Sequence, residues 1–227
     1  RYSMKFETES FVEQPIFDVA GTFRALMTDN HGYMSDATAP IYGPNARRIP
    51  DGDTVTKPIE LVVASIGREQ ELTLYAAEFP RSERAGVLPL PSVLALGAYA
   101  VQPGPILRGK RVLERFACMH LGTPIQGAEA ALPPDTLTVE RTNRQRTAAA
   151  TSPATCTTCH RQINPPGCAF EHYDAVGQWR AKDNGQAVDA SGTRTLAGGE
   201  QITFTDGVDF AHQLAGSDRV RDCYVLH

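Results

Sequence analysis

Apolar residues near the start of the chain recur at intervals of three and four, the spacing that places side chains on one face of an α-helix. Helix-like spacing of this kind is present between Phe6 and Tyr42 and predicts helices there. The turn-forming segment 29–36 (DNHGYMSD) ends the run. The apolar members of the run are Phe11, Ile16, Val19, Phe23, Leu26 and Met27. Between Ile59 and Glu78, the β-branched segment 59–66 and the alternating segment 71–79 predict two short strands.

Helical spacing returns in the second half of the chain. A helix is predicted after Pro91, and a longer one begins at Pro105, because proline suits the first helical position. Its face would carry Leu113, Phe116, Ala117 and His120, and Gly122 with Pro124 would end it. A hairpin-like element is expected over 189–204. A final helix follows, with Asp206 as its N-cap and with Val208, Ala211 and Leu214 pointing inward. The predicted fold is mainly α, with a few short strands and long irregular segments.

One segment has almost no large apolar residues. Residues 125–153 are rich in Ala, Pro, Thr and Arg, which indicates a linker or an extended covering segment. We therefore predict four parts: 1–80, the end of a preceding helical domain with short strands; 81–124, a helical segment; 125–153, the linker; and 154–227, a ligand-binding domain.

Composition and charge narrow the function classes. The chain has 227 residues and a formal net charge of -4 without a basic run, which argues against a nucleic-acid-binding surface. The longest apolar stretch is too short to cross a bilayer. The chain starts without an export leader, and its last residues have helical character without a cap. We therefore expect a fragment or a processed subunit, truncated at the C-terminus.

The segment 154–167 (ATCTTCHRQINPPG) holds the clearest chemistry. Cys156 and Cys159 are separated by two residues, and His160 follows directly. Two thiols three positions apart on a helical turn can form thioethers with the two vinyl groups of a haem, and the adjacent histidine can then bind the iron. The spacing therefore predicts one covalent haem c with His160 as a metal ligand.

Three alternatives compete with haem. A zinc site would need four ligands, and Cys168 with His172 would supply the second pair at an unusually tight spacing that leaves His160 unused. A thioredoxin-like redox pair would follow a strand, and none is predicted before Cys156. An accidental match would leave these cysteines free or disulfide-bonded.

Residues after the motif could complete a haem pocket. Apolar or aromatic bodies that can cover a porphyrin are present at Ile163, Phe170, Tyr173 and Trp179. The carbonyl oxygen of Pro165 or Pro166 could accept a hydrogen bond from the ring nitrogen of His160 that faces away from the iron. Arg180 or Arg161 could pair with a haem propionate.

The stretch 156–193 resembles a cytochrome-like domain family of unknown function, found in large exported proteins of Planctomycetes and myxobacteria. The matching positions are Cys156, Cys159, His160, Pro166, Gly167, Phe170, Glu171, Tyr173, Asp174, Ala175, Gly177, Arg180, Asp189, Ala190, Ser191 and Gly192. Segments 84–96 and 104–114 resemble the first half of the family, with Gly104 where the family usually has a capping serine. Segments 23–43 and 209–227 resemble the neighbouring domains, and Arg47 to Phe79 matches least.

The resemblance implies a cytochrome c-like haem domain, and no activity comes with it. Family members often carry cysteines at positions similar to Cys118 and Cys223, which implies a disulfide between them. Cys168 is then expected to be a buried free thiol. Covalent haem and a disulfide both imply a periplasmic or otherwise exported bacterial protein.

The sixth iron ligand would separate electron transfer from catalysis. No methionine follows His160; His172 lies too near it, and His212 has polar neighbours. The remaining candidates are Met119 and His120. The leading hypothesis is a monohaem electron-transfer module that exchanges electrons with a partner protein or an adjacent domain. The alternatives are the haem-bearing part of a peroxidase or of a dehydrogenase of sugars or other organic substrates, and a structural domain stabilised by its haem.

Overall fold

The computed structural model describes residues 2–17, 21–59, 70–123 and 140–226. Val19, most of the first predicted strand and the first half of the predicted linker lie outside these residues. The helices are α1 (Tyr2–Phe17), α2 (Phe23–Thr28), α3 (Ala39–Tyr42), α4 (Pro91–Ala95), α5 (Pro105–Arg115), α6 (Asn143–Ala150), α7 (Ala154–Cys168), α8 (Gly207–Gly216) and α9 (Asp218–Leu226), with a 3-10 turn η2 (Ala197–Gly199). The strands are β1 (His31–Met34), β2 (Arg47–Arg48), β3 (Thr54–Ile59), β4 (Gln70–Glu78), β5 (Lys182–Asp183), β6 (Gln186–Ala187), β7 (Gly192–Thr195) and β8 (Gln201–Phe204).

The prediction of a mainly α fold was wrong. The structure is mixed, with 45% helix, 18% strand and three small antiparallel sheets. Most of the unexpected strands are too short to show an alternating pattern: β1 is HGYM, and β2, β5 and β6 have two residues each. Such strands exist because a longer neighbour supplies their hydrogen bonds, which the local sequence does not reveal.

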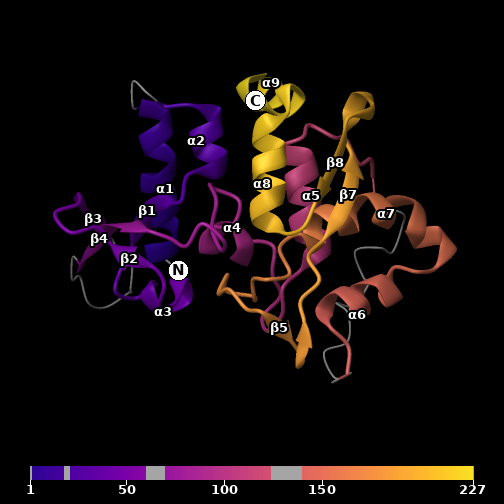
Figure 1. The fold of residues 1–227 in the computed structure, drawn as a ribbon, viewed down its shortest axis with the longest axis horizontal. Coiled ribbons are helices and arrows are strands. Elements are labelled where there is room, and N and C mark those ends of the chain that lie inside the picture. Colours follow the sequence, from indigo (N-terminus) through magenta and orange to yellow (C-terminus); the bar gives the residue numbers. More distant parts are fainter. Residues whose placement is uncertain (1, 18–20, 60–69, 124–139, 227) are drawn as a thin grey trace, which may run out of the picture.

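The largest sheet is organised around β4, the strand predicted over 71–79. β1 pairs along one edge of β4, with Tyr33 opposite Ala76. β2 and then β3 pair along the other edge, with Thr56 opposite Thr73. Helices α1 and α2 stand side by side beyond this sheet (Figure 1).

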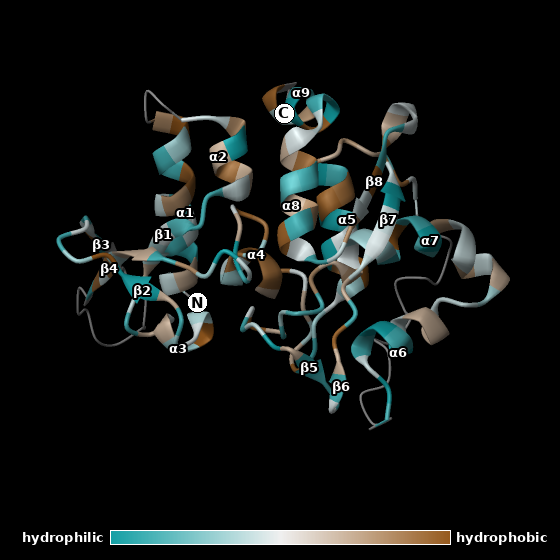
Figure 2. Cartoon of the chain, viewed as in Figure 1, coloured by the Kyte–Doolittle hydropathy of each residue, from teal (hydrophilic) through white to brown (hydrophobic). Residues whose placement is uncertain are grey.

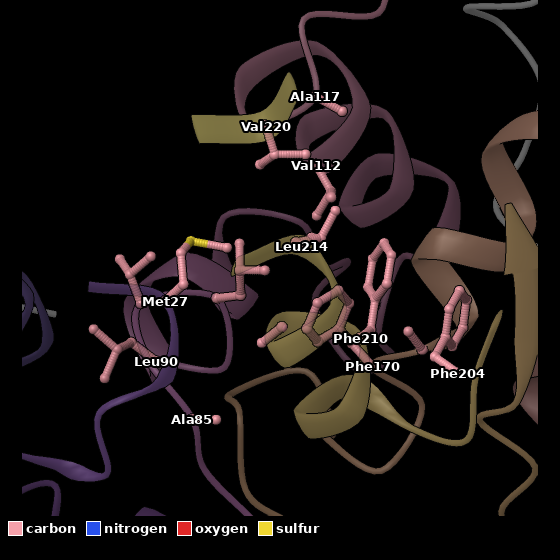
Figure 3. Packing of buried hydrophobic residues seen from close by; sticks show 14 of the residues in the cluster. Met27, Ala85, Leu90, Val112, Ala117, Phe170, Phe204, Phe210, Leu214 and Val220 are labelled. Atoms are coloured by element: carbon pink, nitrogen blue, oxygen red, sulfur yellow. The ribbon is translucent and has the colours of Figure 1, made fainter. Parts of the chain in front are cut away.

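The main hydrophobic core joins both halves of the chain. Phe11, Leu26 and Met27 pack in the same cluster as Phe170 and Phe210. Figure 3 shows Met27, Phe170 and Phe210 in this cluster. Figure 2 shows brown, hydrophobic segments on α4 and α5, which contribute Leu94 and Val112 to this cluster. Leu90, the residue before α4, belongs to it as well. The predicted boundary at residue 80 stays a prediction, although this packing crosses it.

Several local predictions were confirmed. α5 begins at Pro105, and β7 and β8 form the hairpin expected over 189–204. Asp206 caps α8, since its carboxylate accepts from the backbone N–H groups of Val208 and Asp209 at 2.8 Å each. Ala211 and Leu214 are fully buried in the core.

Two helix predictions need correction, and one helix lies in a segment where none was predicted. α5 ends at Arg115, because Cys118 adopts a positive φ of 45° and turns the chain out of the helix. Phe116, Ala117 and His120 therefore lie beyond it. The single final helix is divided into α8 and α9 at Ser217. The described part of the predicted linker contains helix α6, whose N-cap Thr142 forms a reciprocal capping box with Gln145.

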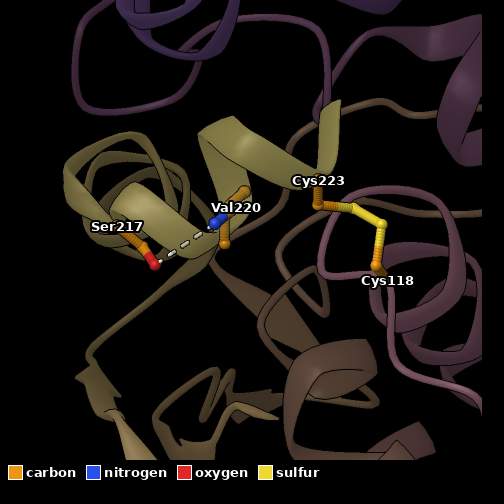
Figure 4. Close-up of a disulfide and its surroundings, with 4 residues drawn as sticks. All are labelled: Cys118, Ser217, Val220 and Cys223. Carbon is orange, nitrogen blue, oxygen red and sulfur yellow. Dashed lines mark hydrogen bonds between the residues drawn. A yellow bond between two sulfur atoms is a disulfide. The ribbon is translucent and has the colours of Figure 1, made fainter. Parts of the chain in front are cut away.

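The implied disulfide is present. Cys118, after α5, is bonded to Cys223 on α9, with Cα atoms 5.7 Å apart (Figure 4). At the start of α9, Ser217 Oγ accepts from the N–H of Val220 and donates to Glu200 at 2.7 Å. The disulfide therefore links the segment that follows α5 to helix α9.

α5 and α7 cross at very close distance because each has a glycine at the contact. A β-carbon at Gly109 would lie 2.1 Å from the carbonyl oxygen of Ile163, and one at Gly167 would lie 1.8 Å from that of Pro105. This crossing holds α7 against the body of the molecule (Figure 1). Among the described residues, no helix is both long enough and apolar enough to span a membrane.

Candidate functional site

The Cys-x-x-Cys-His motif occupies the first two turns of α7. The helix begins after Pro153, whose carbonyl accepts from the N–H groups of Cys156 and Thr157. Thr157 Oγ1 adds hydrogen bonds at 3.0 Å to the carbonyls of Ser152 and Pro153, which stabilises this first turn. The two cysteines are therefore presented on regular helix near the edge of the molecule (Figure 1).

Helical periodicity brings the motif residues together. Cys156, His160 and Ile163 stand at i, i+4 and i+7, so they share one face, and Cys159 lies beside them. Both cysteines are free thiols; Cys159 is exposed, and Cys156 and His160 are half-buried. Ile163 is buried where this face meets the core. The structure therefore places four of the predicted site residues on adjacent positions of one helix, with Ile163 at the buried end of the set.

His160 is held by a side chain, whereas a prolyl carbonyl was predicted. Its Nδ1 lies 3.1 Å from Oδ1 of Asn164, one helical turn further on. Asn164 Nδ2 donates to Thr151 Oγ1 at 2.9 Å, and that hydroxyl donates to the carbonyl of Thr147 at 2.8 Å. Pro165 is occupied elsewhere, since its carbonyl accepts from the N–H of Ala169.

Two of the three aromatic residues predicted to cover a haem lie in the protein core. Phe170 and Tyr173 are each 1% exposed. Phe170 packs against Phe210 at 6.2 Å between ring centroids, and Tyr173 donates its hydroxyl hydrogen to the carbonyl of Glu83. Trp179 is half-buried and stacks on His172 at 5.3 Å. The structure thus assigns these rings to folding contacts. Pro166 is also buried, at the end of α7 near the crossing with α5.

Arg180 is part of an internal network. Its guanidinium bonds Asp183 at 2.7 Å and approaches Glu171 at 3.5 Å, and its Nε donates to the carbonyl of Glu171. Asn143, at the start of α6, donates to both carboxylate oxygens of Glu171. Burial raises the pKa of Glu171, and the cations of Arg108 and Arg180 oppose that rise. Arg180 therefore stabilises a buried carboxylate; the other predicted propionate partner, Arg161, is exposed.

Arg108 holds the irregular segment that follows α7 by hydrogen bonds to its carbonyl groups. It is 3% exposed, and it donates to the carbonyl oxygens of Phe170, Tyr173 and Asp174 at 3.0, 2.9 and 2.6 Å. Burial lowers its pKa to about 10, so the guanidinium keeps its charge at neutral pH. One side chain of α5 thus satisfies three carbonyl groups of an irregular buried segment.

Arg84 joins distant parts of the chain in the same way. It donates to the carbonyls of Pro89 and Gly177, the latter at 2.6 Å, and it lies over the rings of Tyr42 and Tyr173. Gly177 has a φ of +88°, and a β-carbon there would lie 2.8 Å from Cα of Pro91. Arg84 and Gly177 lie in the segments 84–96 and 156–193, which resemble the cytochrome-like family. Their contacts in the structure stabilise the fold.

The two candidate sixth ligands have other surroundings. The sulfur of Met119 accepts from Arg194 at 3.3 Å, and the same guanidinium nitrogen donates to Gln162 on α7. Gln162 and His160 project from opposite sides of the helix because they are two residues apart. His120 is exposed. The structure does not bring Met119 to the His160 side of α7.

In the second pair of residues considered as zinc ligands, Cys168 is buried and His172 is hydrogen-bonded to another residue. Cys168 is 4% exposed at the far end of α7, and burial raises the pKa of its thiol to about 12. His172 Nδ1 is paired with the carbonyl of Arg180 at 2.9 Å. Among the described residues, no group of three or more His, Cys, Asp or Glu could hold a metal ion. The expectation that Cys168 is a buried free thiol was confirmed.

Sequence reasoning missed Asn164, Thr151, Arg108 and Arg84. Asn164 carried a usable signal, since it stands four residues after His160 on a predicted helix. Arg84 and Arg108 lie in the family-like segments 84–96 and 104–114, but the carbonyl groups that they bind are brought close only by folding. Thr151 carried no signal for its contact with Asn164, which also depends on folding.

Comparison with known proteins gives a match to a family model. Residues 84–183 match the sequence model of the PSCyt3 family, described as a protein of unknown function (DUF1588). No curated protein and no solved structure matches the chain. The matched range covers less than half of the chain, and it includes Arg84, Arg108, the Cys-x-x-Cys-His segment and Arg180. The family name suggests a cytochrome-like domain.

Proposed function

We propose that this chain carries one haem c, attached through Cys156 and Cys159, with His160 as a ligand of the iron, and that it serves as a monohaem electron-transfer module. The observation that carries the proposal is the face of α7 itself. Two free thiols and an imidazole share adjacent turns, at the spacing that c-type haem attachment requires.

The residues present suit this group. Both thiols are accessible or partly accessible, and neither belongs to the disulfide. The Nδ1 of His160 is paired with Asn164, which leaves Nε2 as the nitrogen available to a metal. Ile163, on the same face, is buried and anchors this part of α7. When bound, a haem would supply one-electron oxidation and reduction at its iron.

The cellular location follows from the same chemistry. Covalent haem attachment and stable disulfides both belong to oxidising compartments. The Cys118–Cys223 bond supports placement in the bacterial periplasm or in another exported setting. The redox partner would be a separate protein or an adjacent domain of a larger chain.

A second function is favoured by the surroundings of Met119. Its sulfur is already a hydrogen-bond acceptor for Arg194, so the better apolar candidate for a sixth ligand is engaged. An exchangeable sixth position would suit a haem oxidoreductase of the peroxidase or organic-substrate dehydrogenase type.

Haem attachment is tested by expressing the full chain, with export to the periplasm, in a bacterium that attaches c-type haems there. We expect denatured protein to keep its absorbance after acid-acetone extraction. Cys156→Ser and Cys159→Ser should each lose one thioether bond, and the double variant should lose the colour. Cys168→Ala is the matched control, because this thiol is buried away from the motif, and it should keep both bonds. Colour that washes out of the wild type would contradict covalent attachment.

The two functions are separated by ligand binding to the reduced protein. An electron carrier whose protein supplies both axial ligands of the haem iron should show low-spin bands that carbon monoxide leaves unchanged. An oxidoreductase with an exchangeable position should bind carbon monoxide readily, and Met119→Leu should then leave the spectrum unaltered. Loss of the low-spin bands in Met119→Leu would instead identify Met119 as the sixth ligand.

A further inference from the structure

The contact between His160 and Asn164 is the outer end of a chain of hydrogen bonds. Asn164 is anchored by Thr151, and Thr151 by the carbonyl of Thr147, at the end of α6. Thr147 is fully buried and Thr151 is 8% exposed. The orientation of an Asn on the partly exposed helix α7 is therefore set by buried groups of the preceding helix.

The direction of each hydrogen bond in this chain is determined. The Thr147 carbonyl can only accept, so it uses the hydroxyl hydrogen of Thr151. Thr151 Oγ1 must then accept from Asn164, which places the amide nitrogen toward Thr151 and the amide oxygen toward His160. That oxygen can only accept, so Nδ1 of His160 carries the hydrogen. The lone pair of the neutral ring is consequently on Nε2.

We propose that Asn164 is a positioning residue for the iron ligand: it fixes the tautomer and ring orientation of His160 and strengthens the imidazole as an electron donor. This inference rests on the proposed function, and Asn164 contacts His160 rather than the iron. A hydrogen bond from Nδ1 raises the basicity of a metal-bound imidazole. A more basic ligand stabilises the oxidised iron, so Asn164 lowers the reduction potential.

The first test uses the full chain without haem, labelled with 15N at histidine, at a pH where the rings are neutral. Nitrogen shifts, with His160→Gln for assignment, should show the hydrogen of His160 on Nδ1. Asn164→Leu should move it toward Nε2. Thr151→Val should shift it in part, because the amide is then free to turn over, and Thr151→Ser should restore it. Gln162→Leu, a polar residue on the opposite side of α7, is the matched control and should change nothing.

The second test measures the reduction potential of the haem-loaded protein. Asn164→Leu should raise it, Asn164→Asp should lower it, and Gln162→Leu should leave it at the wild-type value. A hydrogen on Nε2 in the wild type would overturn the inference, as would variants that lower thermal stability without moving the potential. If the protein takes up no haem, the proposed function fails, and the tautomer measurement still decides whether Asn164 positions His160.

Discussion

At Glu7 a carboxyl group is 98% shielded from solvent yet has no cation bonded to it among the described residues. One oxygen accepts from the N–H and hydroxyl of Ser35 at 2.9 Å and from the hydroxyl of Thr38, and the other accepts from Tyr42 at 3.1 Å. Burial raises the pKa of Glu7 from its usual value of 4.5, and these hydrogen bonds only partly oppose the rise. A single residue therefore couples the stability of the N-terminal part to pH.

We predict that Glu7→Gln becomes progressively more stable than the wild type as the pH rises above 4.5. In that window the folded wild type retains a proton that the unfolded chain releases, so its stability falls by up to about 1.4 kcal/mol per pH unit, until the pH passes the folded pKa. Gln can keep the Ser35 and Thr38 contacts and donate to Tyr42. Urea unfolding from pH 4 to 8 measures the difference. The control is Glu9→Gln, at a half-buried residue whose side chain pairs with Lys5, and its difference from the wild type should not vary with pH. A difference for Glu7→Gln that does not vary with pH would refute the prediction.

Between elements, the α5–α7 crossing decides where the motif helix lies. Gly109 and Gly167 let the two backbones meet, and the side chain of Arg108, next to Gly109, reaches the carbonyls beyond α7. The β7–β8 hairpin adds a third contact, since Gly192 lets the ring of Phe204 pack against the strand near Pro165. Helix α7 is thus supported along its second half, while its first two turns carry the thiols.

Gly109→Ala and Gly167→Ala should each destabilise the protein by roughly 2 kcal/mol or more, because the new methyl group would overlap backbone atoms and force the helices apart. Helix propensity alone predicts the opposite, a gain of up to about 1 kcal/mol. Gly216→Ala on α8 is the matched control, since nothing lies within 4 Å of a β-carbon there. Chemical denaturation compares the three. Equal behaviour of all three variants would show that the crossing is looser than described.

At the scale of the whole molecule, the disulfide and the main hydrophobic core both join segments that are far apart in the sequence. Cys118 and Cys223 are 105 residues apart in sequence, so their bond closes a loop that includes α6, α7 and the β7–β8 hairpin. The core cluster brings α8, which lies inside that loop, into contact with α2, which lies outside it. The motif helix is consequently enclosed in a cross-linked part of the chain.

Removing the bond in a Cys118→Ala, Cys223→Ala double variant should lower the free energy of unfolding by roughly 4–5 kcal/mol, the cost expected for releasing a loop of this length in the unfolded state. Thiol titration of denatured, unreduced protein gives a second readout. The haem-free chain should show three reactive thiols, Cys156, Cys159 and Cys168. The haem-loaded chain should show only Cys168. Five reactive thiols would disprove the disulfide.

The sequence alone determined what depends on neighbours along the chain: the start of α5 at Pro105, the Asp206 cap, the β7–β8 hairpin, and the motif of Cys156, Cys159 and His160. Turns, caps and helical spacing act over a few residues, so their physics is local. Even Asn164 lies within this range, at four residues from His160.

Only the tertiary structure decided which polar and aromatic residues are free to act. Phe170, Tyr173 and Arg180 have the chemistry of a haem pocket, but they are committed to the core and to the Glu171 network. The short strands beside β4 likewise depend on a partner far along the chain. Long-range contacts use the same side chains that a haem pocket would need. Which role a side chain takes depends on its burial and on the hydrogen-bond partners that buried polar groups require, and neither can be read from a local sequence pattern.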